Sequence, residues 1–244
     1  MALFGGKNLA AGAPSAKGPR GDKVRRSKAD AEQTRLKIID AAEALFCARG
    51  IAQTTLEQIA REAGATRGAI YWHFKDKTDV LKAIYDRYKP PQLARLEAAI
   101  NAPDGEDPLD ILEATGVEFL ALIETNERQR RLHLIMLSGL PNDETAPWRE
   151  TINCEIQGLL RKLMLRAQEE GRLAPDISAE EAALSQMVLI NGLIGEWQRA
   201  GRSFSLSLMG GRMLQRFMAA LRTPLRAPLP APLAAPFSPV QTAD

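Results

Sequence analysis

This 244-residue sequence is poor in the residues that build extracellular folds and many enzyme sites. It has two cysteines and two histidines, and aromatic residues make up only 5% of it. Because Cys47 and Cys154 cannot form a disulfide framework, we expect both to be reduced and buried. No apolar run reaches the roughly 18 residues of a membrane-spanning helix, and the N-terminus lacks the apolar stretch of a secretion signal. The sequence therefore predicts a cytoplasmic protein with no membrane partner.

Motifs for catalysis and metal binding are missing as well. Neither His73 nor His133 lies beside a Cys or an acidic residue at the spacing of a metal site. The sequence contains no P-loop, no Gly-rich dinucleotide turn after a strand and no nucleophile elbow. Acidic pairs such as Glu169-Glu170 fall on helical surfaces, where solvated carboxylates are ordinary. We therefore expect no catalytic residue, no metal, no cofactor and no enzymatic activity.

The charge of the chain is divided unevenly, although the net value is only +2. Residues 1–90 carry 17 Lys and Arg against 10 Asp and Glu, whereas the remainder carries 15 against 20. A basic front half and an acidic rear half indicate that only the front meets a polyanion. A solvated basic tail is the alternative, because residues 7–28 supply seven of the basic side chains. Composition alone leaves both interpretations open.

The two ends of the chain differ from its middle. Residues 1–26 are rich in Gly, Ala, Pro and Lys without periodicity, which predicts a disordered basic tail. A translation start at Val24, encoded by GTG, is the alternative for residues 1–23. Residues 223–244 hold six of the 15 prolines, which predicts an extended Pro-rich tail.

The middle of the chain predicts helices only. An apolar stripe at helical spacing runs up to Gly50, which suits a left-handed C-terminal cap. Thr55 followed by Gln58 forms a capping-box pattern, and Gly64 turns the chain after the short helix that this box opens. No stretch alternates polar and apolar residues like a strand. Besides the helix that ends at Gly50, we expect helices over 55–63, 66–74, 76–88, 92–101, 108–125, 127–138, 148–170, 178–200 and 204–221, and thus an all-α fold.

The helices at 55–63 and 66–74 flank the tight turn in the manner of a helix-turn-helix. In that motif, the second helix enters the DNA major groove by its N-terminal end. Arg67 there can donate two hydrogen bonds to a guanine edge, and Ala69 can touch a thymine methyl. Tyr71 and His73 can donate to phosphates. Taken singly, an Arg on a short helix is more often a solvated charge, but the combination favours DNA binding.

Longer stretches resemble one family. TTLEQIAREAGATRGAIYWHFKDKTDVL resembles the DNA-binding domain of TetR-family transcriptional regulators. TRGAIYWHFKDK is similar to the multidrug-efflux repressors of the AcrR/TtgR type within that family. VRRSKADAEQTRLKIIDAAEALFCARG and INGLIGEWQRAGRSFSL extend the resemblance over roughly residues 24–222. The resemblance implies a helix-turn-helix DNA-binding domain over 27–75 and a ligand-binding and dimerisation domain over 76–222.

The resemblance also implies the residues that contact double-stranded DNA. Base contacts fall to Arg67, Gly68 and Ala69. Phosphate contacts fall to Thr55, Thr66, Tyr71, Trp72, His73 and Lys77.

For the rear helices, the resemblance implies dimerisation and ligand binding, with plain core packing as the alternative for each residue. The expected homodimer interface consists of Ile156, Leu159, Leu160, Leu163, Met187, Val188, Asn191, Gly192 and Gly195. The expected pocket for a small hydrophobic ligand consists of Ile84, Tyr88, Leu112, Phe119, Ile123, His133, Met136, Met187, Ile190 and Trp197. Glu196 would balance the charge of a cationic ligand, or is simply solvated.

Together these inferences predict a homodimeric, ligand-responsive repressor on a palindromic operator, released by its ligand and controlling a multidrug efflux operon. One alternative is a TetR-type regulator of a metabolic pathway that senses a lipid or an acyl thioester. The other is a helical binding protein whose front half docks onto protein instead of DNA. Activation instead of repression also stays open.

Overall fold

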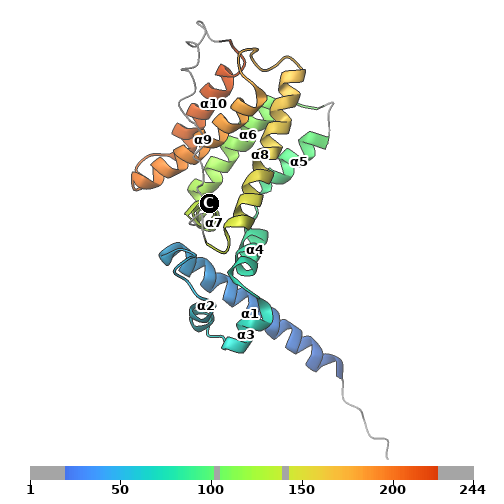
Figure 1. Ribbon diagram of the computed structural model, residues 1–244, viewed down its shortest axis with the longest axis vertical. Coiled ribbons are helices and arrows are strands. Elements are labelled where there is room, and N and C mark those ends of the chain that lie inside the picture. Colours follow the sequence, from blue (N-terminus) through green and yellow to red (C-terminus); the bar gives the residue numbers. More distant parts are fainter. Residues whose placement is uncertain (1–19, 102–104, 139–142, 225–244) are drawn as a thin grey trace, which may run out of the picture.

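The computed structural model describes residues 20–101, 105–138 and 143–224 (Figure 1). Within these ranges every regular element is helical, so the prediction of an all-α fold is confirmed. The elements are α1 (Arg20–Arg49), α2 (Leu56–Glu62), α3 (Arg67–His73), α4 (Lys77–Tyr88), α5 (Pro91–Asn101), α6 (Pro108–Thr125), α7 (Glu127–Ser138), α8 (Ala146–Glu169), α9 (Ala179–Arg199), a π-helical turn η1 (Leu206–Gly210) and α10 (Gly211–Ala220).

Local side-chain caps begin the short front helices, as the sequence predicts. Thr55 Oγ1 accepts a hydrogen bond from the Gln58 amide, and Gln58 Oε1 accepts one from the Thr55 amide. Thr66 and Asp76 cap α3 and α4 in the same way. Gly64 has a φ of +65°, which an L side chain rarely adopts. These caps satisfy backbone N–H groups that have no partner within a helix.

The last predicted helix, 204–221, is divided in the structure. Residues 206–210 form the π-helical turn before α10 begins. The Glu124 carboxylate of α6 accepts hydrogen bonds from the amides of Leu206 and Ser207, at 3.0 and 2.8 Å. A Cβ atom on Gly210 would lie 3.2 Å from Leu120 of α6. The turn is therefore held closely against α6, a tertiary contact that the local sequence does not reveal.

The molecule has two large apolar cores, and the first of them connects its front to its rear. The first joins α1, α2, α3 and α4 to Leu132 and Ile135 of α7 and to Ile152 of α8. The second lies among α5, α6, α8, α9 and α10. In Figure 1, α1 to α3 lie at one end, α4 lies between, and the remaining helices form the other end. The predicted boundary at residues 75 and 76 thus falls inside a continuous core.

Other expectations meet mixed outcomes. Cys47 and Cys154 are exposed, so the prediction that they are buried is wrong, because both lie on outward faces of their helices. Residues 20–26, expected to be disordered, belong to α1. Most of the two predicted tails, residues 1–19 and 225–244, lies outside the described residues. Across the described ranges, no helix combines the length and apolar character that crossing a membrane requires.

Candidate DNA-binding surface and ligand pocket

The inner side of α3 is fixed by the first apolar core, which we call the front core. Ile70 and Phe74, which are four residues apart, are both buried, and Ile59 of α2 is buried in the same cluster. The one-turn spacing places Ile70 and Phe74 on one face of the chain. The rest of α3 is thereby turned outwards in a defined orientation.

The outward side of α3 carries residues that were predicted to contact DNA. The Arg67 side chain is 76% exposed and Trp72 is 73% exposed. Tyr71, Gly68 and the cap residue Thr66 are exposed as well. A Cβ atom on Gly68 would meet only Thr66 Oγ1, at 3.9 Å. The protein's own packing therefore does not require glycine there, whereas a close external surface would.

Glu57 of α2 holds two of these residues in place. Its Oε1 atom accepts a hydrogen bond from the Tyr71 hydroxyl at 2.8 Å and lies 3.5 Å from Arg67 Nη2. The hydrogen bond from Tyr71 lowers the pKa of Glu57, so the carboxylate is charged at neutral pH. Exposed ion pairs of this kind contribute little to stability. Arg67 is therefore oriented but easily released to another partner.

His73 and Ala69 are less exposed than their neighbours. Burial, with a contribution from Arg35, lowers the pKa of His73. The Trp72 ring lies edge-on to His73, with ring centroids 4.5 Å apart. His73 is consequently a neutral imidazole at physiological pH, able to donate one hydrogen bond.

Lys77 has a different role from the one predicted. Its side chain is only 17% exposed, and Nζ donates to the Ile51 carbonyl at 3.0 Å. Nζ also lies 3.4 Å from Glu144 Oε1, and the neighbouring Thr78 hydroxyl donates to the Glu144 carbonyl at 3.2 Å. In this structure Lys77 joins the segment after α1 to the segment before α8, so its ammonium is already paired on the side predicted to contact a phosphate.

A buried ion pair holds that segment. Arg149 Nη2 lies 2.9 Å from Asp143 Oδ2, and both side chains are less than a tenth exposed. Arg149 also donates to the Thr145 hydroxyl and, at 3.3 Å, to the carbonyl of Met136 on α7. Thr145 and Arg149 lower the pKa of Asp143 against the effect of its burial. Glu144 is thus fixed between two anchored neighbours.

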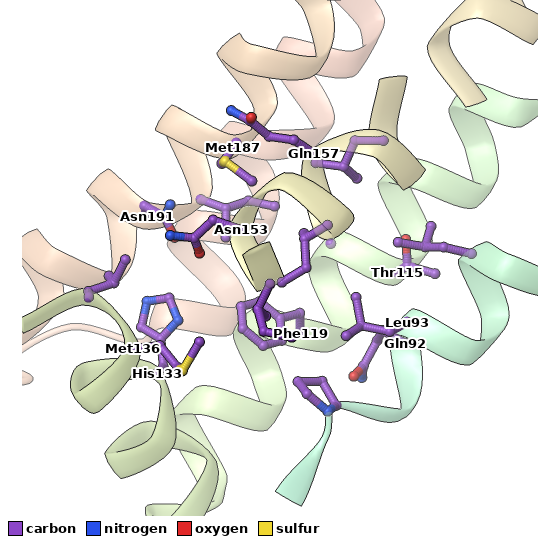
Figure 2. A pocket seen from close by; sticks show the side chains of 18 of the residues that line it. Gln92, Leu93, Thr115, Phe119, His133, Met136, Asn153, Gln157, Met187 and Asn191 are labelled. Carbon is purple, nitrogen blue, oxygen red and sulfur yellow. The ribbon is translucent and has the colours of Figure 1, made fainter. Parts of the chain in front are cut away.

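A cavity of about 340 Å³ lies among the rear helices (Figure 2). Figure 2 shows His133 and Met136 of α7, Met187 and Asn191 of α9, and Phe119 of α6 around it. Its lining is predominantly apolar, with several amide side chains. The lining residues are Tyr85, Pro90, Gln92, Leu93, Leu96, Thr115, Gly116, Phe119, Gln129, Leu132, His133, Met136, Leu137, Glu150, Ile152, Asn153, Ile156, Gln157, Leu160, Gln186, Met187, Ile190 and Asn191.

Half of the predicted pocket residues line this cavity, namely Phe119, His133, Met136, Met187 and Ile190. The predictions for the other half are wrong, because their side chains lie elsewhere. Ile84 and Leu112 are buried in the first and second core, and Ile123 and Trp197 are buried in a third, smaller cluster. Tyr88 turns towards Arg128, which donates to its hydroxyl at 2.5 Å, and Tyr85 of the same helix lines the cavity instead.

Sequence reasoning missed the glutamines of the cavity. Gln92, Gln129 and Gln186 line it, from α5, α7 and α9. A signal was present, since Gln186 interrupts the apolar stripe of α9 and is buried. Glu196, proposed to balance a cationic ligand, is exposed and paired with Arg199. The acidic residue among the described lining is Glu150.

His133 lies in the cavity wall and carries no charge at neutral pH. Burial lowers its pKa to about 4. The Phe119 ring meets it edge-on, with ring centroids 5.8 Å apart. Among the described residues, no group of three or more His, Cys, Asp or Glu could hold a metal ion.

The exposed apolar surface of the rear part differs from the predicted interface. Leu163 of α8 is 0% exposed and Leu160 is 7% exposed, so neither has surface to offer a partner. Ile156, Leu160, Met187 and Asn191 line the cavity, and Leu159 packs at the edge of the second core. Val188, in contrast, is 62% exposed. The large apolar residues that lie open in the rear part are Leu134 and Leu137 of α7, Leu184 and Val188 of α9, Leu208 and Met209 of η1, and Met213 of α10.

Known proteins resemble this chain over most of its length. The profile described as bacterial regulatory proteins of the tetR family matches residues 38–84, which run from α1 into α4. The HTH-type transcriptional repressor BepR of Brucella suis biovar 1 is 37% identical over 205 residues, covering 82% of this chain and 98% of BepR. The HTH-type transcriptional regulator TtgR of Pseudomonas putida is 33% identical over 178 residues, covering 71% of this chain and 84% of TtgR.

A solved structure shows the same similarity in three dimensions. The SmeT–triclosan complex has a TM-score of 0.67 and 31% sequence identity, and the match covers 82% of this chain and 99% of SmeT. SmeT is described as the repressor of the Stenotrophomonas maltophilia multidrug efflux pump SmeDEF.

The low pKa of His133 makes stability depend on pH. An unfolded chain binds a proton on this imidazole near pH 6.5, whereas the folded protein binds it only near pH 4. The contribution of His133 to stability is therefore intact above pH 6.5 and is lost as the pH falls towards 4. Between pH 7 and pH 5 the contribution of His133 to the free energy of unfolding should fall by about 2 kcal/mol. Urea denaturation of the wild type and of His133→Leu at both pH values measures it. An equal pH dependence of the two proteins would contradict this assignment.

Proposed function

Because this chain belongs to the TetR family of bacterial regulatory proteins, we propose that it is a repressor that binds a palindromic operator as a dimer. The repressed genes would form a multidrug efflux operon. A hydrophobic ligand that enters the rear cavity would release the repressor from the operator. The family consists of DNA-binding transcriptional regulators of the helix-turn-helix type, not of enzymes. The single observation that carries the proposal is the outward face of α3, with Arg67, Gly68 and Trp72 open beside Glu57.

The face of α3 suits a major groove. Arg67 lies in the first turn of α3, where a recognition helix contacts bases, and its guanidinium can bind guanine O6 and N7 together. Gly68 and Ala69 would let the helix approach the base edges closely. Thr55, Thr66, Tyr71, Trp72 and His73 would contact phosphates and fix the register. A protein partner has no comparable need for a bare glycine between Arg67 and the short Ala69.

Dimerisation would use α9 and α10 with η1, not α8. Leu184 and Val188 are one turn apart on α9, and Gly192 and Gly195 continue their face. A Cβ atom on either glycine would meet nothing within 4 Å, so a partner helix could approach closely. Leu208, Met209 and Met213 would extend the apolar surface. Two-fold pairing through this face would present two α3 helices to two half-sites.

The relatives support control of efflux. SmeT and NalD are both described as repressors of multidrug efflux pumps, and SmeT has been captured with triclosan. The cavity of this chain, with Phe119, Met136 and Met187 in its wall, fits a hydrophobic molecule of that size class. Sensing of an acyl thioester is less favoured, because the described lining of the cavity includes no Lys or Arg that could bind the phosphate groups of a carrier.

Polar contacts offer a path between the cavity and α3. Met136 lines the cavity, and its carbonyl accepts from Arg149, which pairs with Asp143. The adjacent Glu144 contacts Lys77 and Thr78 at the start of α4. A ligand that displaces α7 or α8 would move the start of α4 and so the spacing of the two α3 helices. Release requires that the ligand bind the displaced arrangement more tightly.

Arg67→Ala should weaken operator binding about 10- to 100-fold, because a bidentate Arg–guanine pair contributes about 1–3 kcal/mol of discrimination. Fluorescence anisotropy with a duplex from upstream of the gene and with a shuffled duplex measures it. Arg61→Ala, which removes an exposed charge from α2, is the control and should weaken both duplexes alike. Equal losses on the two duplexes for Arg67→Ala would refute base reading by this residue.

Val188→Glu should convert the dimer to monomers, because the two-fold axis would bring two carboxylates into one apolar interface. Multi-angle light scattering at micromolar concentration measures the mass, and operator affinity should fall with it. Leu134→Glu is the matched control, since Leu134 is an exposed apolar residue on α7, outside the proposed face. An unchanged mass for Val188→Glu would place the interface elsewhere.

Glu144→Gln should uncouple the cavity from the operator without closing the cavity. It removes the ionic contact with Lys77 but keeps the carbonyl that accepts from Thr78. Titration calorimetry should give an unchanged triclosan affinity, whereas the effect of triclosan on operator affinity should fall severalfold. Glu180→Gln, which breaks an exposed ion pair with Arg161, should leave both unchanged. Full retention of coupling in Glu144→Gln would exclude this route.

A further inference from the structure

Unsatisfied polar atoms gather at one place in the described part of the molecule. Six buried side-chain atoms lack a hydrogen-bond partner there, and two of them, on Glu43 and Arg166, lie in ion pairs. The other four all belong to residues that line the cavity: Gln92 Oε1, Gln129 Oε1, Gln186 Oε1 and His133 Nε2. Buried polar groups in proteins nearly always have partners, so such a cluster indicates a ligand site.

The orientation of two of these glutamines is fixed by the backbone. Gln129 Nε2 donates to the Tyr88 carbonyl at 2.8 Å, and Gln186 Nε2 donates to the Leu112 carbonyl at 3.2 Å. A carbonyl oxygen only accepts, so each side chain must present its NH₂ group to it. Both glutamines are more than nine-tenths buried. Each therefore keeps a buried, unpartnered acceptor, Oε1, on a side chain that lines the cavity.

Neighbouring residues strengthen this pattern. The Thr115 hydroxyl donates its hydrogen to the Ile111 carbonyl at 2.7 Å, which leaves its oxygen as an acceptor as well. A Cβ atom on Gly116 would lie 2.6 Å from Leu214 and 3.7 Å from Gln186 Nε2. The glycine thus makes room for Leu214 of α10, while the Gln186 amide of α9 lies beside it at an ordinary contact distance. The acceptors are built into the wall by the packing of α6, α7 and α9.

The cavity has few charged side chains that could compensate the desolvation of a charged ligand. Glu150 is exposed, and the described lining holds no Lys or Arg. Desolvation lowers the pKa of His133 to about 4, which shows how strongly this environment disfavours a positive charge. A cation in the cavity would incur the same penalty. A neutral hydrogen-bond donor satisfies the glutamine oxygens without this desolvation penalty.

We propose that the cavity selects an uncharged, largely apolar molecule that carries at least two hydrogen-bond donors, hydroxyl or N–H, which Gln129 Oε1 and Gln186 Oε1 accept. This inference rests on the proposed function, because it specifies the ligand class of the same cavity. A molecule of equal shape that carries only acceptors leaves both glutamine oxygens buried and unpaired. Such a loss is costlier than the loss of a methyl contact, so the glutamines determine specificity.

Titration calorimetry with the full chain, without DNA, tests the proposal. The probes are bisphenol A and 4,4′-biphenol, each compared with its own dimethyl ether, and tetraphenylphosphonium as an apolar cation. Methylation keeps the skeleton and removes both donors. Each diphenol should bind at least about tenfold more tightly than its ether, and the cation should bind more weakly than the diphenols.

Two substitutions locate the selectivity. Gln129→Met and Gln186→Met should each weaken diphenol binding about tenfold and leave ether binding unchanged or tighter. Gln157→Met is the matched control, because Gln157 also lines the cavity but is exposed, so water satisfies its amide. Thermal unfolding verifies that each variant is folded. The probe comparison on the wild type stands even if one variant does not fold.

Several outcomes would overturn the proposal. These are equal or tighter binding of the ethers, tighter binding of the cation than of both diphenols, no binding of either diphenol, and an equal effect of Gln157→Met. Because the titration contains no DNA, these outcomes leave operator binding untouched. Failure to bind any operator would instead refute the proposed function while the diphenol selectivity persisted.

Discussion

The buried ion pair between Arg149 and Asp143 joins three parts of the rear region. Arg149 lies at the start of α8, Asp143 precedes that helix, and the Met136 carbonyl that Arg149 also contacts belongs to α7. Burial of such a pair is costly in itself, but removal of one partner leaves an uncompensated charge and costs about 3–5 kcal/mol. The pair therefore sets geometry more than it adds stability. It determines where α7 ends relative to α8, and so the shape of one cavity wall.

The contacts of α4 follow from that geometry. Lys77 and Thr78 reach Glu144, while Val80 and Ile84 of the same helix are buried in the front core. The helix is thus held by polar groups at its start and by apolar packing along its length. A rigid element of this kind transmits a displacement at one end to the other. The continuous core explains why α4 belongs to both parts of the molecule.

Local signals were sufficient for the helices but not for the site. The capping box at Thr55 was identified because a cap depends on residues within three positions. The outward side of α3 was also predictable, since Ile70 and Phe74 fix the inner side. The partner of Lys77 lies 67 positions away in sequence, and no periodicity reveals it. Leu163 and Val188 are both apolar residues on long helices, and only tertiary packing makes one core and the other surface. For the same reason the cavity glutamines were missed.

The close contact at Gly116 has a consequence for how this cavity can evolve. A Cβ atom there would lie 2.6 Å from a terminal methyl group of Leu214 of α10, so a side chain at this position requires the buried Leu214 to move. On the opposite wall, Asn153 and Gln157 of α8 are half-buried and exposed, and nothing in the cores depends on them. After a gene duplication, a new ligand preference would therefore arise most easily through α8. The α6 wall, with Thr115 beside Gly116, would remain the inherited part of the site.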